Sequence, residues 1–141
     1  MKIAIAETAA GRAACFAIRR TVFIDEQQIP EAEEWDDYDA TALHILAEDA
    51  HGPAGTARLI AAGTVAKIGR VAVLRAYRGT GLGRALMTMA LQIGKSQGFE
   101  VAALDAQLSA VAFYARLGFV AEGPEFDDGS GILHRRMTLS L

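Results

Sequence analysis

The feature that most constrains the fold is a glycine-rich turn between an apolar, strand-like segment and an amphipathic helix. Residues 71–74 read Val-Ala-Val-Leu, and glycines follow at positions 79, 81 and 83. Apolar side chains then recur at helical spacing, and Gly98 stands where a helix would end. These apolar positions are Leu82, Leu86, Met89, Ala90 and Ile93. The pattern predicts a strand, a tight turn and a long helix in direct succession.

The same turn has the properties of a phosphate-binding site. Its glycines allow backbone N–H groups to converge, and the start of the helix adds unpaired N–H groups and a positive dipole end. Arg78 and Arg84 flank the turn and can donate charge-assisted hydrogen bonds. The G-K-[ST] and G-x-G-x-x-G nucleotide motifs are both absent. A pyrophosphate site is therefore one interpretation of the turn, and a tight turn without a ligand is the other.

The remaining pattern predicts a mixed arrangement of strands and helices in one domain, residues 1–141. A helix follows Thr8 as far as residue 24, and residues 25–39 form a loop or one short helix. A helix at 110–117 follows the long one, and Gly69 predicts a bulge. Strands are expected at 2–6, 42–48, 54–61, 64–74, 101–104, 119–122 and 132–139. Together these elements predict an α+β or α/β fold with a sheet of six or seven strands.

The net charge of −3 conceals a segregation of charge along the chain. Residues 25–39 hold eight acids and no Lys or Arg, whereas residues 50–99 hold seven bases and no acid. The basic stretch includes the glycine-rich turn, which favours an anionic ligand there. The total charge argues against a nucleic-acid-binding protein.

Several other classes of protein do not fit the sequence. No apolar run approaches the roughly 18 residues that a membrane span requires. Cys15 is the only cysteine, and the three histidines lie far apart without metal-ligand spacing. We therefore expect a soluble cytoplasmic protein that binds no metal, no nucleic acid and no membrane.

The segment 78–83, Arg-Gly-Thr-Gly-Leu-Gly, resembles the R-x-x-G-x-G/A signature of the GCN5-related N-acetyltransferases, the GNAT superfamily. The segment 113–119, Phe-Tyr-Ala-Arg-Leu-Gly-Phe, also stands where that family has it. The resemblance covers nearly the whole chain. Residues 19–27, with Pro30 and His44, look like a bacterial branch whose acceptors are largely unassigned. The resemblance implies a mostly antiparallel sheet, splayed at an acetyl-CoA cleft and flanked by about four helices.

The resemblance also implies where acetyl-CoA, the cosubstrate, would bind. Main-chain groups of Val71 and Val73 would pair with the pantetheine arm, as a strand would. Amides of residues 79–84 would hold the pyrophosphate, and an amide near Val73 would stabilise the oxyanion. The expected cosubstrate-binding residues are Val71, Ala72, Val73, Arg78, Gly79, Thr80, Gly81, Leu82, Gly83 and Arg84.

Catalytic roles follow from the same resemblance. Tyr114 is the expected general acid, which would protonate or hydrogen-bond the departing thiolate; its other interpretation is a core aromatic of an amphipathic helix. Glu26 and His44 are candidate general bases, although Glu26 could belong to a solvated acidic face and His44 could be structural. A reaction without a dedicated base also remains open. Cys15 has no context for a nucleophile, so we expect direct transfer without an acyl-enzyme.

The acidic block at 25–39 falls where the family commonly places the acceptor site. Eight carboxylates there would favour a cationic acceptor, such as a polyamine, an aminoglycoside-like amine or a basic peptide. Trp35 and Tyr38 add contacts for cations and apolar stems. A solvated loop that only aids solubility is the alternative. The sequence thus predicts an N-acetyltransferase for primary amines, with the monomer and the homodimer both open. The alternatives are a non-catalytic acetyl-CoA-binding or sensing module and a plain interaction domain.

Overall fold

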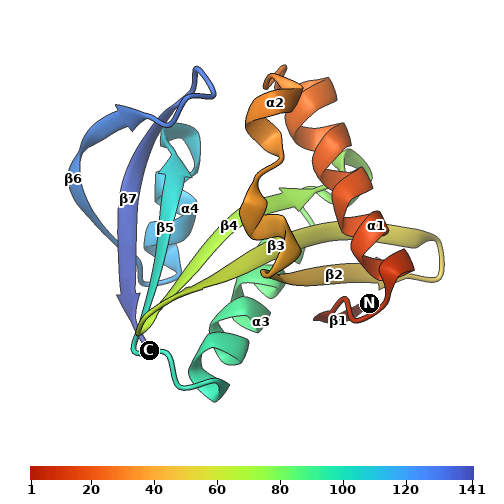
Figure 1. Cartoon of the computed structure of the whole chain (residues 1–141), viewed down its shortest axis with the longest axis horizontal. Coiled ribbons are helices and arrows are strands. Elements are labelled where there is room, and N and C mark those ends of the chain that lie inside the picture. Colours follow the sequence, from red (N-terminus) through yellow and green to blue (C-terminus); the bar gives the residue numbers. More distant parts are fainter.

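Seven strands cross the protein as one continuous sheet in a computed structural model that describes residues 1–141 (Figure 1). The strands are β1 (Lys2–Ile5), β2 (Leu43–Asp49), β3 (Gly52–Ala62), β4 (Val65–Val73), β5 (Val101–Gln107), β6 (Val120–Asp127) and β7 (Leu133–Ser140). Their spatial order is β1-β2-β3-β4-β5-β7-β6, and only β4 and β5 run parallel. The predicted mixed fold with a mostly antiparallel sheet is therefore confirmed.

Four α-helices accompany the sheet: α1 (Ala9–Arg19), α2 (Glu31–Glu34), α3 (Leu82–Ser96) and α4 (Val111–Arg116). The hydroxyl of Thr8 caps α1 by accepting from the N–H of Gly11 at 3.0 Å, as predicted. The chain continues from α1 into a π-helical turn, Arg20–Glu26. The acidic block forms two short helices, α2 and a 3-10 turn at Asp37–Ala40, where the sequence predicted a loop or one helix. None of the helices has both the length and the apolar character needed to span a membrane.

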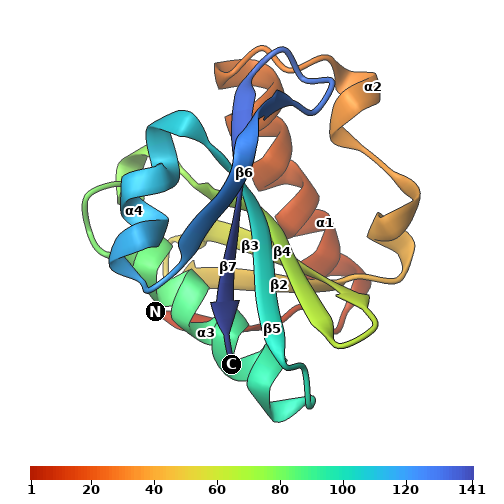
Figure 2. The ribbon, with the colours of Figure 1, turned by 90° about the vertical axis from the view of Figure 1, so that its left-hand side faces the viewer.

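The two longest helices pack on opposite faces of the sheet, because side chains alternate along each strand. On β2, Ile45 and Ala47 belong to the core under α3, whereas Leu46 belongs to the core under α1. The two cores together explain why the central strands are buried on both faces. Figure 2 shows α4 and α2 on opposite sides of the strands β5 and β7.

Close packing of α3 on β3 depends on Gly55, and we expect Gly55→Ala to lower the free energy of unfolding by about 1–3 kcal/mol. A methyl group there would lie 2.9 Å from Leu86 and 3.0 Å from the carbonyl oxygen of Ala72. Gly69→Ala is the matched control, since its methyl group would meet nothing within 4 Å. Urea unfolding measures both variants. Equal midpoints for the two would contradict the packing argument.

The sheet opens between β4 and β5, which positions the site. The two strands pair only at Val65–Lys67 and Val101–Ala103. Beyond these residues they diverge into the V visible in Figure 1. On the other side of β4, Ala57 of β3 stands opposite two residues, Arg70 and Val71, because Thr56 pairs with Ala72 and Arg58 with Gly69. The bulge predicted near Gly69 is therefore present, one residue further along the chain.

Candidate active site

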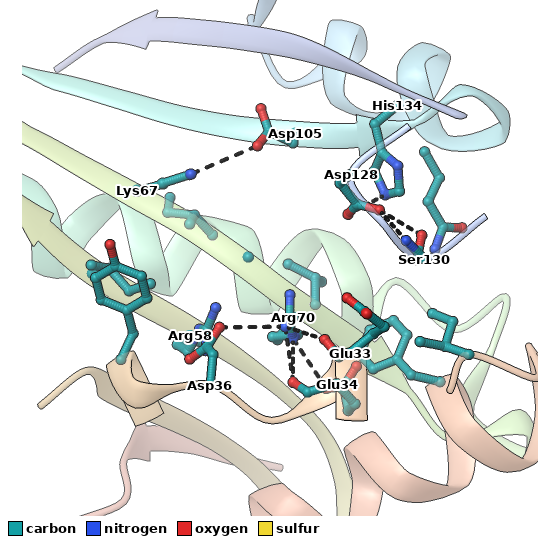
Figure 3. Close-up of a pocket in the computed structure, with 18 of the residues that line it drawn as sticks. Glu33, Glu34, Asp36, Arg58, Lys67, Arg70, Asp105, Asp128, Ser130 and His134 are labelled. Carbon is teal, nitrogen blue, oxygen red and sulfur yellow. Dashed lines mark hydrogen bonds and ion pairs between the residues drawn. The ribbon is translucent and has the colours of Figure 1, made fainter. Parts of the chain in front are cut away.

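A cavity of about 660 Å³ lies at the opening between β4 and β5, within the usual size range of small-molecule sites. Its floor is β4 around the bulge, and its far wall is β5 with Tyr114 of α4. Glu33 of α2 and the turn between β6 and β7 complete the lining. Figure 3 shows Arg58, Arg70, Asp36 and Glu34 on one side, with Asp105, Asp128 and His134 on the other. The cavity thus joins polar groups from both halves of the splayed sheet.

The bulge places Arg70 in the left-handed region, with φ of +50°. This conformation costs a side-chain-bearing residue about 1–2 kcal/mol. The Arg70 guanidinium donates to the carbonyl oxygen of Glu34 at 2.9 Å and lies 3.1 Å from the Glu34 carboxylate. These contacts compensate for the strain and tie α2 to the cavity floor. The sequence signalled the bulge through Gly69, but it did not indicate that the residue after the glycine would adopt the positive φ.

A buried ion-pair network holds the acidic block against the sheet. Arg19 is fully buried and contacts the carboxylates of Glu34 at 2.8 Å and Asp39 at 2.7 Å. Arg58 contacts Asp39 at 2.9 Å and Asp36 at 2.7 Å. Burial raises the pKa of the Glu34 carboxyl, and the adjacent guanidiniums oppose that rise. The network therefore holds one wall of the cavity in place through ion pairs in which opposite charges neutralise one another.

These ion pairs show that the acidic stretch 25–39 and the basic stretch 50–99, which are separate along the sequence, meet in the folded protein. Five of the eight acids in residues 25–39 contact an arginine, and four of the seven bases in residues 50–99 contact an acid. Much of the acidic block therefore neutralises basic residues instead of facing solvent. The acids of the block without such a contact are Asp25, Glu33 and Asp37, and among them only Glu33 lines the cavity.

Tyr114 reaches the cavity from α4 and stands edge-to-face against Phe113 and Phe119, at centroid distances of 5.0 and 6.1 Å. Burial raises the pKa of its phenol to about 12. The phenol therefore stays protonated at neutral pH and can donate a hydrogen bond into the cavity. Both interpretations of this residue meet in the structure: the ring packs in the core, and the residue lines the cavity.

The glycine-rich turn forms the start of α3, as predicted. Gly79 and Gly81 have φ of +77° and +86°, and a Cβ on either would meet nothing within 4 Å, so the backbone is open to a ligand. Thr80 directs its hydroxyl to the carbonyl of Tyr77. Gly83 packs beside Phe113, since a Cβ added at this glycine would lie 3.5 Å from the ring. The turn is thus braced from within, while its amides remain on the surface.

The other expected cosubstrate residues occupy different environments. Val71 lines the cavity, and Ala72 is buried in the core under α1. Leu82, the first residue of α3, is buried in the core between that helix and the sheet. Beyond Lys67, β4 has no pairing with β5, so no strand pairs with Val71 or Val73 on that side. The carbonyl of Val73 accepts from Arg78 Nε at 3.0 Å. Arg84 is exposed on the first turn of α3.

The two candidate bases do not line the cavity with Tyr114. Glu26 accepts two hydrogen bonds from Arg78, at 2.6 and 3.1 Å, and so neutralises an arginine of the glycine-rich turn. His44 is 2% exposed and donates from Nε2 to the carbonyl oxygen of Asp39 at 2.9 Å, with its ring against Phe16. Glu26 is therefore an ion-pair partner in this structure, and His44 is enclosed in the core.

His134 and Asp128 line the cavity, although the sequence did not single them out as site residues. His134 lies on β7 and Asp128 in the turn before it, and 3.5 Å separates Nε2 of the histidine from Oδ2 of the aspartate. No local motif marks this pair, because the pairing of β7 beside β5 brings it to the cavity. The turn-forming run Asp127–Gly131 was the available signal, and it indicates only a loop.

The comparisons with known proteins agree with this architecture. Residues 9–141 match the family model described as an acetyltransferase (GNAT) domain. A proposed acetyltransferase of Bacillus subtilis (strain 168) is 37% identical over 126 residues, 87% of this chain and 85% of the relative. The uncharacterized N-acetyltransferase YjcF of the same strain is 33% identical over 138 residues, 97% and 98% of the two chains. The crystal structure of a proposed N-acetyltransferase from Lactobacillus plantarum superposes with a TM-score of 0.90 at 32% identity, covering 99% and 97%.

A splayed sheet with an open glycine turn and a cavity at the opening defines an acyl-CoA-dependent transferase. The chain belongs to the GNAT acetyltransferase family. It is an acetyl-CoA-dependent N-acetyltransferase, and the residues present fit that cosubstrate. The open backbone at Gly79 and Gly81 fits a pyrophosphate, and the unpaired stretch of β4 fits an extended arm.

Proposed function

We propose that this enzyme transfers the acetyl group of acetyl-CoA directly to the primary amine of a cationic small molecule or basic peptide. The observation that carries the proposal is that Tyr114, Glu33 and Asp128 line one cavity. Neither carboxylate contacts a lysine or arginine within 4 Å, whereas the neighbouring carboxylates are neutralised. A positively charged acceptor would therefore meet two carboxylates that no lysine or arginine neutralises, next to the proposed reaction centre.

The chain's own residues would divide the work as follows. Backbone amides of residues 79–84 hold the pyrophosphate of the cosubstrate, with Arg78 and Arg84 beside it. Main-chain groups of Val71 to Val73 align its arm, and an N–H near Val73 hydrogen-bonds the developing oxyanion, where one donor is worth about 10²–10³ in rate. Tyr114 donates its phenolic proton toward the departing sulfur. Cys15 takes no part, because it lies on the buried face of α1 and its thiol donates to the carbonyl of Ile45.

Release of free thiol from acetyl-CoA tests this proposal across a panel of amines. The panel pairs polyamines, aminoglycosides and basic peptides with uncharged amines of similar size. We expect thiol release that depends on the acceptor, with higher kcat/KM for the cationic members and a decline as salt rises. A protein that acetyl-CoA stabilises against heat, but that releases no thiol with any amine, would instead be a binding or sensing module.

Glu33 gives the acceptor preference a specific test. We expect Glu33→Gln to raise the KM of a cationic acceptor about fivefold, which corresponds to about 1 kcal/mol for one lost charge contact. Asp37→Asn is the matched control, because Asp37 belongs to the same acidic block but does not line the cavity. A similar KM change in both variants would indicate only the general field of the block.

A cytoplasmic location belongs to the proposal and is supported by the single, unpaired cysteine.

A further inference from the structure

A buried histidine lines the cavity and has one ring nitrogen that no hydrogen bond within the protein uses. His134 is 6% exposed and lines the cavity. Its Nδ1 donates to the carbonyl oxygen of Ile132 at 2.7 Å, which fixes both the ring orientation and the neutral tautomer. Nε2 therefore carries the lone pair of the neutral ring. No hydrogen bond within the protein uses that nitrogen, and its nearest ionic neighbour is Asp128 at 3.5 Å.

The sheet explains why this histidine faces the same cavity as Tyr114. On β7, His134 pairs with Gln107, the last residue of β5, and Gln107 also lines the cavity. The chain passes from Gln107 through a short turn into α4, which carries Tyr114. On the outer side, Phe126 of β6 stacks on the imidazole with a centroid distance of 6.1 Å. The ring is thus held between two strands, while Tyr114 occupies the adjoining helix.

Asp128 is positioned to stabilise a protonated imidazole. One of its oxygens, Oδ1, accepts from the N–H and the hydroxyl of Ser130, at 3.0 and 2.6 Å. This leaves Oδ2 directed at His134 (Figure 3). Partial burial by itself would raise the pKa of Asp128, but the bonds from Ser130, the charge of His134 when it is protonated and the charge of Arg70 lower it. An ionised carboxylate therefore faces the ring at neutral pH.

We propose that His134 is the general base that removes a proton from the acceptor ammonium, with Asp128 as its positioning residue. This inference rests on the proposed amine acetylation. Nε2 takes one proton from the ammonium, and the amine lone pair then forms the C–N bond at the thioester carbonyl. As the C–S bond breaks, its electron pair leaves with the sulfur, which takes the phenolic proton of Tyr114. The second proton of the attacking nitrogen restores the phenol, and the imidazolium releases its proton to solvent.

Other charged groups share the cavity and shape any pH profile. Besides His134, the charged or titratable residues that line the cavity are Glu33, Glu34, Asp36, Tyr38, Arg58, Lys67, Arg70, Asp105, Tyr114 and Asp128. Asp127 of the same turn lies at the end of β6, where it pairs with Leu133. Among the side-chain types in this cavity, His134 included, imidazole is the one that ordinarily exchanges its proton close to neutral pH. The base is also separate in space from Glu26 and His44, neither of which lines the cavity.

The test compares His134→Gln, Asp128→Asn and His51→Gln with the unaltered enzyme, by thiol release with one accepted amine from pH 6 to pH 10. His51 is the matched control, because it is exposed in the turn between β2 and β3. We expect His134→Gln to lower kcat/KM for the amine about 100-fold at pH 7, the lower end for a positioned proton acceptor. The deficit should shrink as pH approaches the pKa of the amine, since free amine needs no base. Asp128→Asn should show a smaller deficit with the same pH trend, and His51→Gln none.

Two further measurements separate a proton acceptor from a merely structural histidine. Imidazole added to His134→Ala should restore part of the rate, and acetyl-CoA should still raise the melting temperature of every variant. A deficit below about twofold, a deficit independent of pH, or a loss without imidazole rescue would each overturn the assignment. An unaltered enzyme that releases no thiol with any amine would overturn the proposed function itself, and the assignment with it.

Discussion

Replacing Arg19 with methionine should lower the free energy of unfolding by about 3–5 kcal/mol, the usual cost of breaking a buried ion pair. Arg19 is fully buried at the end of α1 and donates to Glu34 and Asp39. Its guanidinium also lies 4.9 Å from the ring of Trp35. Methionine fills much of the same space but leaves the buried carboxylate of Glu34 and the half-buried carboxylate of Asp39 with fewer partners. Because Glu34 lines the cavity and Asp39 contacts Arg58, which also lines it, the acceptor KM should rise as well.

The adjacent residue provides a matched control. Arg20→Met removes an exposed ion pair with Glu31, and we expect it to leave the urea midpoint nearly unchanged. Urea unfolding of the two variants at pH 7 measures the difference. Equal destabilisation by Arg19→Met and Arg20→Met would contradict the view that the buried network, and not the acidic surface, holds this wall.

The same network predicts acid sensitivity. Burial alone would raise the pKa of Asp39, but the hydrogen bonds and charges of Arg19 and Arg58 outweigh it and hold that pKa at about 2. The folded value lies below the ordinary aspartate value, so this carboxylate stabilises the fold above about pH 4. That stability is lost as pH falls toward 2. The unaltered protein should therefore lose more stability over this interval than Arg19→Met, in which the pKa of Asp39 is less depressed.

Local patterns predicted the elements well because their causes are local. Thr8 caps α1, and Gly98 follows the end of the long helix with φ of +87°. Of the apolar positions predicted for α3, Leu82, Leu86 and Ala90 are buried, while Met89 and Ile93 are partly buried. The bounds of β6 were predicted least well, since the strand expected at 119–122 runs from Val120 to Asp127 through Gly123 and Pro124. That strand continues to Asp127 across an irregular register with β7, because pairing along the sheet overrides the local signals.

The chemistry of the cavity was harder to predict, because it depends on contacts between distant parts of the chain. Arg58 and Arg70 are separated from Asp36 by 22 and 34 residues, so their mutual neutralisation left no trace in the charge pattern. Net charge along a sequence reports which side chains exist, not which of them meet. His134 was equally hidden, since only strand order places it beside β5. Tyr114 was the exception, because the family resemblance carries its position in a short motif.

Tyr114→Phe should lower kcat by about 10²–10⁴-fold while leaving acetyl-CoA affinity within a few-fold. The substitution removes one hydroxyl that no residue of the protein engages, so packing against Phe113 and Phe119 is retained and stability should change little. Burial holds the phenol at a pKa of about 12, above its ordinary value of 10, so the donor remains protonated across the assay range. Its contribution to stability is complete below about pH 10 and is lost as pH rises through 12.

Tyr77→Phe is the matched control, because the Tyr77 hydroxyl donates to Asp49 at 3.0 Å and the residue does not line the cavity. Thiol release at saturating acceptor gives kcat for both variants, and the acetyl-CoA-dependent rise in melting temperature reports cosubstrate binding separately. A kcat for Tyr114→Phe within about twofold of the unaltered enzyme would exclude the phenol as proton donor. The departing thiolate would then leave unassisted, and the aromatic packing around Tyr114 would account for the residue by itself.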